Sequence, residues 1–188
     1  MRQEIMRKIV LFSAISIDGY IAQKDGNIDW LYEFDAKTKE RQDETKKAFF
    51  EFYDTIDTTF IGNNTYKHMI SNGDKAPFSD KINYVFTKSK KEKSENAIFV
   101  NDNLLELIAN KKNLKNKKNI WLVGGGILNS YFLENQLIDE IILDVIPIVL
   151  GNGIRIFENC SNISPVEFQC YKIKNYPSGA VQQYFTKK

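Results

Sequence analysis

The fold is decided by the segment Ile120-Trp121-Leu122-Val123-Gly124-Gly125-Gly126-Ile127-Leu128-Asn129-Ser130-Tyr131-Phe132. Its first four residues are apolar and partly β-branched, as in a parallel strand that is covered on both faces. The glycines carry no Cβ, so a ligand can approach the turn closely. The amphipathic helix that follows directs unpaired N–H groups and its positive dipole end at the same space, which suits a phosphate. The segment therefore predicts a nucleotide pocket in an α/β fold.

Length and composition indicate a single soluble domain over residues 1–188. The hydrophobic fraction of 43% and the charged fraction of 27% are ordinary, and a net charge of +2 is too small to indicate a nucleic-acid partner. Cys160 and Cys170 lack the CxxC spacing, so we expect a reducing cytoplasm. The apolar run at 9–15 is too short for a signal peptide or a membrane span.

Strand and helix patterns alternate along the chain, which predicts an α/β sheet that is parallel at first and has an antiparallel C-terminal edge. We expect strands at residues 8–16, 58–61, 81–87, 97–100, 120–123, 139–149, 166–174 and 180–186. We expect helices at about 39–53, 63–70, 104–110 and 126–135, with Asn63 or Asn64 as one N-cap and residues 101–103 as another. Loops are expected at 72–77 and 150–153.

Several kinds of site are excluded by what the sequence lacks. The motif G-x-G-x-x-G would need glycine at Asn129, and the Gly-Lys-Ser/Thr of a P-loop is missing. His68 is the only histidine. The chain therefore cannot have a catalytic triad and a further histidine besides, nor a metal site with two histidine ligands, and we expect no metal. What remains is chemistry that a bound cofactor performs. Hydride transfer from a reduced nicotinamide needs two flat rings with their reacting atoms about 3 to 3.5 Å apart.

The order of several segments resembles the order in dihydrofolate reductase-like proteins: 9–22, 29–31, 57–66, 84–89 and 121–133. Residues 137–153, with Asp-Glu followed by Pro-x-x-Leu-Gly-x-Gly, resemble more specifically the C-terminal reductase domain of the bifunctional riboflavin-biosynthesis deaminase-reductase and its stand-alone relatives. The resemblance implies a three-layer fold with a mostly parallel central sheet. It also implies NADPH across the carboxyl ends of the strands and reduction of a pyrimidine- or pteridine-like ring, such as 5-amino-6-(5-phosphoribosylamino)uracil.

The resemblance also assigns roles to individual residues. It places Ala14 and Ile21 beside the nicotinamide, and Thr87 and Lys88 beside the adenosine 2′-phosphate. The pyrophosphate is expected at two strand-to-helix turns, of which the second often contains a cis bond between its first two glycines. The first turn holds Gly62, Asn63 and Thr65, and the second holds Gly124, Gly125, Gly126 and Ile127.

Substrate contacts are expected from Ser16 in the first loop, from Trp30 at the substrate mouth and from Phe49. The helix at 39–53 presents an aromatic face, for which plain core packing is the alternative interpretation of most rings. Asp18 and Asp29 are the candidate proton donors, with water as the other source. A homodimer is expected by analogy with the family. The strand at 141–149 is either part of its interface or a central buried strand.

Two departures from the family pattern bear on the cofactor and the substrate. Asn63 stands where the family usually has the arginine that contacts the 2′-phosphate, so either Lys88 or Lys67 supplies that charge or NADH is also accepted. Lys46 stands near the acidic residue with which dihydrofolate reductases hold the pterin. The sequence thus predicts an NADPH-dependent or NADH-dependent reductase. Dihydrofolate reductase activity and a non-catalytic nucleotide- or flavin-binding protein are the alternatives.

Overall fold

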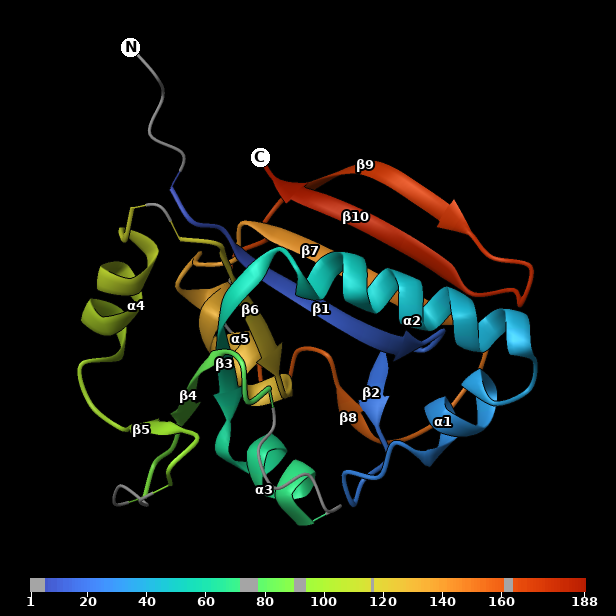
Figure 1. The fold of residues 1–188 in the computed structure, drawn as a ribbon, viewed down its shortest axis with the longest axis horizontal. Helices are drawn as coiled ribbons and strands as arrows, with labels where there is room; N and C mark the ends of the chain where they lie inside the picture. Colours follow the sequence, from blue (N-terminus) through green and yellow to red (C-terminus); the bar gives the residue numbers. More distant parts are fainter. Residues whose placement is uncertain (1–5, 72–77, 90–93, 116, 161–163) are drawn as a thin grey trace.

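The computed structural model describes residues 6–71, 78–89, 94–115, 117–160 and 164–188 (Figure 1). Its centre is an eight-stranded sheet in the order β5-β4-β3-β6-β1-β7-β10-β9. Neighbours from β5 to β7 are parallel, whereas β10 is antiparallel to both β7 and β9. The predicted fold class is therefore confirmed. The strands are β1 Ile9–Ser16, β3 Ile56–Gly62, β4 Ile82–Phe86, β5 Ile98–Val100, β6 Asn119–Gly124, β7 Glu140–Ile146, β9 Phe168–Asn175 and β10 Val181–Lys187.

Helices cover both faces of this sheet and make a three-layer structure (Figure 1). On one face, Phe52 of α2 packs against Val10 and Trp121. On the other face, Leu128 and Phe132 of α5 join the larger core cluster around β1, β3 and β6. No helix among the described residues is both long enough and apolar enough to span a membrane. The helices are α1 Asp29–Asp35, α2 Lys39–Tyr53, α3 Asn63–Ser71, α4 Leu104–Lys112 and α5 Gly126–Glu134.

The strand β7 corrects one sequence prediction and settles another. It ends at Ile146 rather than at residue 149, because Pro147 has no N–H to continue the ladder. It pairs with β1 on one side and with β10 on the other over its length. Its backbone is therefore saturated by neighbouring strands, which confirms a central buried strand and argues against a dimer interface built on it.

Other corrections concern short elements and helix ends. The helix α1 and a small sheet of β2 Tyr20–Ala22 with β8 Ile154–Arg155 are absent from the sequence prediction. The helix α3 begins at Asn63, so neither asparagine precedes it as an N-cap. Asn103 does precede α4 but makes no side-chain cap hydrogen bond. The predicted loop at 72–77 lies outside the described residues.

Candidate cofactor and substrate site

The strands β1 and β6 separate in the middle of the sheet. Their parallel pairing ends at Leu11 and Leu122, and β1 then continues beside β7 alone as far as Ser16. The Trp121 indole N–H donates a hydrogen bond of 3.1 Å to the carbonyl oxygen of Phe12, the next residue of β1. The chain leaves β1 toward β3 on one side and leaves β6 toward β7 on the other. Such a switch point at the carboxyl ends of strands is where α/β sheets bind ligands.

The two strand-to-helix turns that were predicted to hold the pyrophosphate lie side by side at this edge. A Cβ placed on Gly62 would lie 3.2 Å from the Gly124 carbonyl oxygen. A Cβ on Gly125 would lie 3.2 Å from Thr65 Oγ1 and 3.8 Å from Ile21 Cδ1. The Gly124–Gly125 peptide is cis, as the resemblance implies. The fold thus brings both turns and the strand β2 together around Gly125.

The three adjacent glycines have different surroundings. Gly124 has a φ of +99°, a conformation that favours glycine, and it faces the Asn129 side chain. A Cβ on Gly126 would overlap the Arg155 carbonyl oxygen and would lie 2.7 Å from Glu158 Cγ. Gly126 therefore leaves room for the chain around residue 155 rather than for a ligand. This corrects the expectation that all three glycines serve the approach of a cofactor.

The helices α3 and α5 begin at these two turns, directly after β3 and β6. The first N–H groups of a helix have no intrahelical acceptor, and the positive end of the helix dipole lies there. Gly125 precedes α5 and offers no side-chain cap. The Oδ1 atom of Asn63 in the first turn of α3 is buried and has no hydrogen-bond partner among the described residues. Two helix N-termini therefore meet where a pyrophosphate could bind, whereas the unpaired Asn63 oxygen can only accept a hydrogen bond.

The predicted 2′-phosphate contacts lie on the next strand of the sheet. The end of β4 pairs with the end of β3 through Phe86 and Gly62. The following Thr87 hydroxyl lies 2.9 Å from the Ser89 hydroxyl and accepts the Ser89 N–H over 3.2 Å, which shapes the turn. Lys88 is exposed within this turn. Its position beside the first turn suits a contact with a phosphate at the edge of the site.

The loop after β1 is fastened by Asp18. Its carboxylate accepts hydrogen bonds from the Ser16 hydroxyl at 2.7 Å and from the N–H groups of Leu150 at 3.1 Å and Gly151 at 2.7 Å. The Ser16 bond, with help from the two backbone amides, lowers the pKa of Asp18. A carboxyl group with a lowered pKa stays ionised at neutral pH, which favours an anchoring role over proton donation.

The structure also defines the contacts of the other residues that were predicted to bind substrate or transfer a proton. Ser16 is fully buried, and its hydroxyl also accepts the Tyr20 N–H at 3.0 Å, so both of its bonds serve the loop. Asp29 is exposed at the start of α1 and accepts a bond of 2.7 Å from the Asn27 amide. Trp30 is buried beside Ile146, and its Nε1 has no partner among the described residues.

An aromatic cluster lies between α2 and the strands β1 and β6, on the face of the sheet that α2 covers. Trp121 is its centre, with Phe78 at 4.8 Å, Phe52 at 5.5 Å and Phe49 at 5.9 Å between ring centroids. Phe49 also stacks on Tyr53 at 5.2 Å and is half-buried. The cluster combines both interpretations of the aromatic helix face, since Phe52 is core while Phe49 retains exposed surface.

A buried ion network near the carboxyl end of β7 was missed by the sequence reasoning. Arg41 is 1% exposed, and its guanidinium contacts Asp35 at 2.8 Å and Asp144 at 2.9 Å. Burial opposes the charge of Arg41, but the bonds and charges of Asp144 and Asp35 outweigh it and raise the pKa of Arg41. The available signal was Asp144 itself, because a charged residue within a buried apolar strand requires a partner.

The model of the protein family described as the RibD C-terminal domain matches residues 7–182 of this chain. Over 157 residues the chain is 40% identical to the uncharacterized protein YwjB of Bacillus subtilis (strain 168), covering 83% of the chain and 86% of that protein. Over 187 residues it is 30% identical to the uncharacterized protein YyaP of the same organism, covering 94% and 93%. The similarity thus extends along nearly the whole chain.

Solved structures share the same architecture. A protein of Shewanella sp. PV-4, assigned provisionally to riboflavin biosynthesis, superposes with a TM-score of 0.78 at 26% identity, over 96% of this chain and 99% of that one. The bifunctional deaminase and 5-amino-6-(5-phosphoribosylamino)uracil reductase of Thermotoga maritima gives 0.69 at 14% identity, over 97% and 57%. The dihydrofolate reductase of Enterococcus faecalis, complexed with NADP(H), gives 0.64 at 12%, over 98% and 99%. The last two likenesses establish the dihydrofolate reductase-like fold.

Proposed function

We propose that this chain, which belongs to the family of the RibD C-terminal domain, is a reductase that uses NADPH to reduce a small pyrimidine- or pteridine-like ring. The observation that carries the proposal is the meeting of Thr65, Gly125 and Ile21 where β1 and β6 separate. Those residues were expected around one cofactor, yet they come from three separate segments. The structural likeness to the Thermotoga maritima enzyme, whose name includes 5-amino-6-(5-phosphoribosylamino)uracil reductase, supports a substrate related to that compound.

In this proposal the two helix N-termini hold the pyrophosphate of NADPH by their backbone N–H groups. Gly125 allows close approach, and Thr65 adds a hydroxyl from the neighbouring turn. Ile21 and Ala14 flank the nicotinamide. Asn63 cannot provide the charge of the usual arginine, so Lys88 and Lys67 are left to attract the 2′-phosphate. Because both lysines are exposed, the preference for NADPH over NADH should be modest.

The substrate would lie against the half-buried side of the aromatic cluster, where Phe49 retains exposed surface for a heteroaromatic ring. When bound, NADPH supplies the hydride. The chain orients the two rings and excludes water, while Asp18 keeps the first loop attached to residues 150–151. Asp18 is held ionised, so the proton that completes the reduction comes from water.

Binding of NADPH is the direct test. The Tm is measured with and without about 100 µM NADPH. A ligand present at about a hundred times its Kd stabilises the native state by about 2.7 kcal/mol, which corresponds here to a rise in Tm of about 5 to 10 °C. We also expect the fluorescence of Trp121 to be quenched. Loss of NADPH absorbance in the presence of 5-amino-6-(5-phosphoribosylamino)uracil, or of a simpler aminopyrimidine or pteridine, then measures turnover.

Each outcome has a separate meaning. Absence of both the Tm shift and the quenching contradicts cofactor binding. Binding of NADPH without turnover of any pyrimidine or pteridine favours the alternative of a non-catalytic nucleotide-binding protein. Turnover confined to dihydrofolate assigns the chain to dihydrofolate reduction instead.

A further inference from the structure

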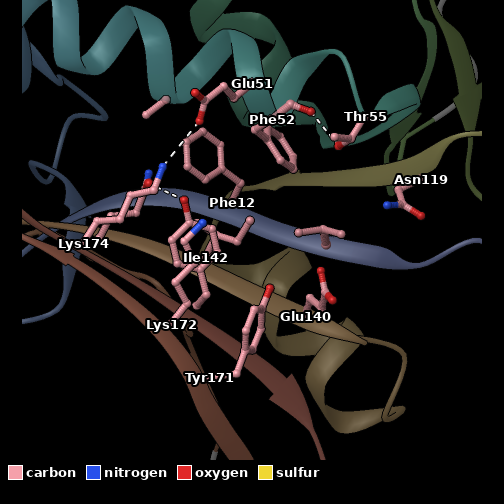
Figure 2. Close-up of a pocket in the computed structure, with 14 residues that line it drawn as sticks. Phe12, Glu51, Phe52, Thr55, Asn119, Glu140, Ile142, Tyr171, Lys172 and Lys174 are labelled. Carbon is pink, nitrogen blue, oxygen red and sulfur yellow. Dashed lines mark hydrogen bonds and ion pairs between the residues drawn. The ribbon is translucent and has the colours of Figure 1, made fainter.

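A cavity with a volume of about 240 Å³ lies between α2 and the strands β1, β7, β9 and β10 (Figure 2). Ala48, Phe52 and Thr55 line it from the α2 side. Phe49 and Tyr53, which face the aromatic cluster of the candidate site, belong to the neighbouring stripe of α2 and are absent from its lining. The cavity also lacks every glycine of the two phosphate turns. It is therefore separate from the cofactor site, with α2 as the shared wall.

The inner surface of this cavity is apolar and aromatic. Phe12 of β1 and Phe52 of α2 lie 4.5 Å apart between ring centroids, and Val10 and Ile142 extend the surface along the sheet. Tyr184 of β10 forms the opposite wall. Flat walls of this kind suit an aromatic ring. The volume is just below the usual range of ligand pockets, about 300 Å³ and upward, so the ligand must be small.

A buried amide supplies a directional contact. Gln182 lines the cavity and is 1% exposed. Its Oε1 accepts the Tyr184 hydroxyl at 2.6 Å and the Tyr176 hydroxyl at 3.2 Å. Both bonds use the oxygen, so the amide N–H groups of Gln182 have no acceptor among the described residues. The Nε2 atom is not among the buried side-chain atoms that lack a partner, so it can be reached from the cavity and can donate to an acceptor that enters it.

Of the charged residues at the rim of the cavity, one lysine has no ion-pair partner among the described residues. Glu51 pairs with Lys174 at 3.4 Å, and Glu140 pairs with Lys8 at 2.5 Å. Lys172 forms no ion pair within the part of the chain that the structure describes. Its Nζ lies 4.8 Å from the centroid of the Tyr184 ring. The uncompensated charge at the cavity is thus positive and adjoins its aromatic wall.

We propose that this cavity binds a small planar aromatic carboxylate. The ring packs between Phe12, Phe52 and Tyr184, and the carboxylate accepts hydrogen bonds from the Gln182 amide and pairs with Lys172. Phe12 and Phe52 also contact the Trp121 ring, at 6.2 and 5.5 Å, so the ligand would press on the cluster that flanks the candidate reductase site. The inference does not depend on the use of NADPH.

The test is a calorimetric titration of the full chain with 2-naphthoate. We expect saturable binding of one equivalent to the unaltered protein and weaker binding of the neutral 2-naphthamide. The variant Lys172→Met should weaken the affinity for 2-naphthoate about two- to fivefold, as loss of an exposed ion pair does. The variant Ala48→Phe should abolish binding by filling the cavity. Lys47→Met removes the same charge from an exposed position of α2 outside the lining and should bind like the unaltered protein.

The absence of saturable binding to the unaltered chain overturns the proposal and leaves a cavity that holds water only. Binding that Lys172→Met and Ala48→Phe leave unchanged also overturns it, since the ligand then sits elsewhere. A thermal melt shows whether Ala48→Phe folds. If it does not, Lys172→Met decides the outcome, because Lys172 is exposed and its side chain is not part of the core.

Discussion

Residues 124, 125 and 126 are all glycine, but each has different neighbours in the folded chain. Gly125 faces Thr65 and Ile21 across the space expected for a cofactor. Gly126 faces the backbone of Arg155 instead. At the residue scale, one motif therefore serves both ligand approach and packing, and substitutions should separate the two.

Gly126→Ala should destabilise the protein by about 1 to 3 kcal/mol, as overpacking of a filled interior does, because its Cβ would overlap the Arg155 carbonyl oxygen. Gly125→Ala should fold nearly as well but bind NADPH less tightly, since its Cβ enters the space beside Thr65. Urea unfolding and titration with NADPH measure the two effects. Equal stability of the Gly126→Ala variant and the unaltered chain would contradict the packing role of Gly126.

Asn63→Arg should raise the affinity for NADPH while leaving that for NADH nearly constant. The substitution provides a guanidinium beside the turn that pairs with β4, and a guanidinium binds phosphate in a bidentate manner. Competitive titration with the two cofactors gives the ratio, and Lys187→Arg serves as a distant control. A parallel gain for both cofactors would show that residue 63 lies away from the 2′-phosphate.

Asp144→Asn should lower the free energy of unfolding by about 2 to 3 kcal/mol, because breaking a buried ion pair leaves part of the Arg41 charge uncompensated. Asp35 remains as a partner, which keeps the loss toward the lower end of such effects. The exposed pair of Lys188 and Glu167 is the matched control, and Lys188→Ala should cost less than about 1 kcal/mol. Urea unfolding of both variants makes the comparison.

At the scale of elements, the loop between β1 and β2 is joined to the segment after β7 by one carboxylate and by a backbone hydrogen bond of 2.9 Å from the Ile17 N–H to the Ile148 carbonyl oxygen. Asp18 accepts bonds from Leu150 and Gly151, which follow β7 directly in the chain. The chain then returns to form β8, which pairs with β2. One side chain therefore reinforces the backbone contacts between two connections at the edge of the candidate site.

The contribution of the Asp18 carboxylate to this attachment should be lost in acid. The folded state lowers the pKa of Asp18 below its unfolded value of about 3.9, so the contribution to stability is present above that value and disappears as the pH falls through the lower folded pKa. Thermal melts between about pH 7 and pH 2.5 should show a steeper acid decline for the unaltered chain than for Asp18→Asn. Asp43→Asn, at an exposed position of α2, should keep the steep decline.

At the scale of the whole molecule, the centre and one edge of the sheet differ in burial. The strand β6 lies between β3 and β1 and is mostly buried, whereas β9 is the outermost strand and is largely exposed, including Tyr171 and Ile173. The backbone N–H groups of an edge strand that face away from the sheet have no strand partner.

Hydrogen exchange should therefore be much faster in β9 than in β6. Local opening of an edge strand requires less free energy than opening of the sheet centre, where exchange approaches the global unfolding limit. Exchange followed by mass spectrometry on peptides that cover the two strands makes the comparison. Protection of β9 equal to that of β6 would mean that another chain covers this edge, which is the form that the expected homodimer would then take.

Much of the fold was predictable from local pattern, and the two strand-to-helix turns expected around one cofactor do lie together. The apolar runs, the glycine turn and the Asp-Glu to Gly-x-Gly segment led to the correct fold class and family. The helix α1, the β2–β8 pair and the Arg41 network were missed, because short elements and buried charges depend on partners far along the chain. Arg41 and Asp144 are separated by 103 residues, so neither residue alone reveals the contact.

The sequence by itself determined most of the longer strands and helices, because periodicity and β-branched or glycine content act over a few neighbouring residues. It also determined the family to which the chain belongs. The tertiary structure decided which of three glycines borders the space expected for a cofactor, why Asp18 fastens a loop, and where a cavity opens beside α2. These features arise from contacts between segments that are distant in the chain, and such contacts are formed only when the whole sheet is assembled.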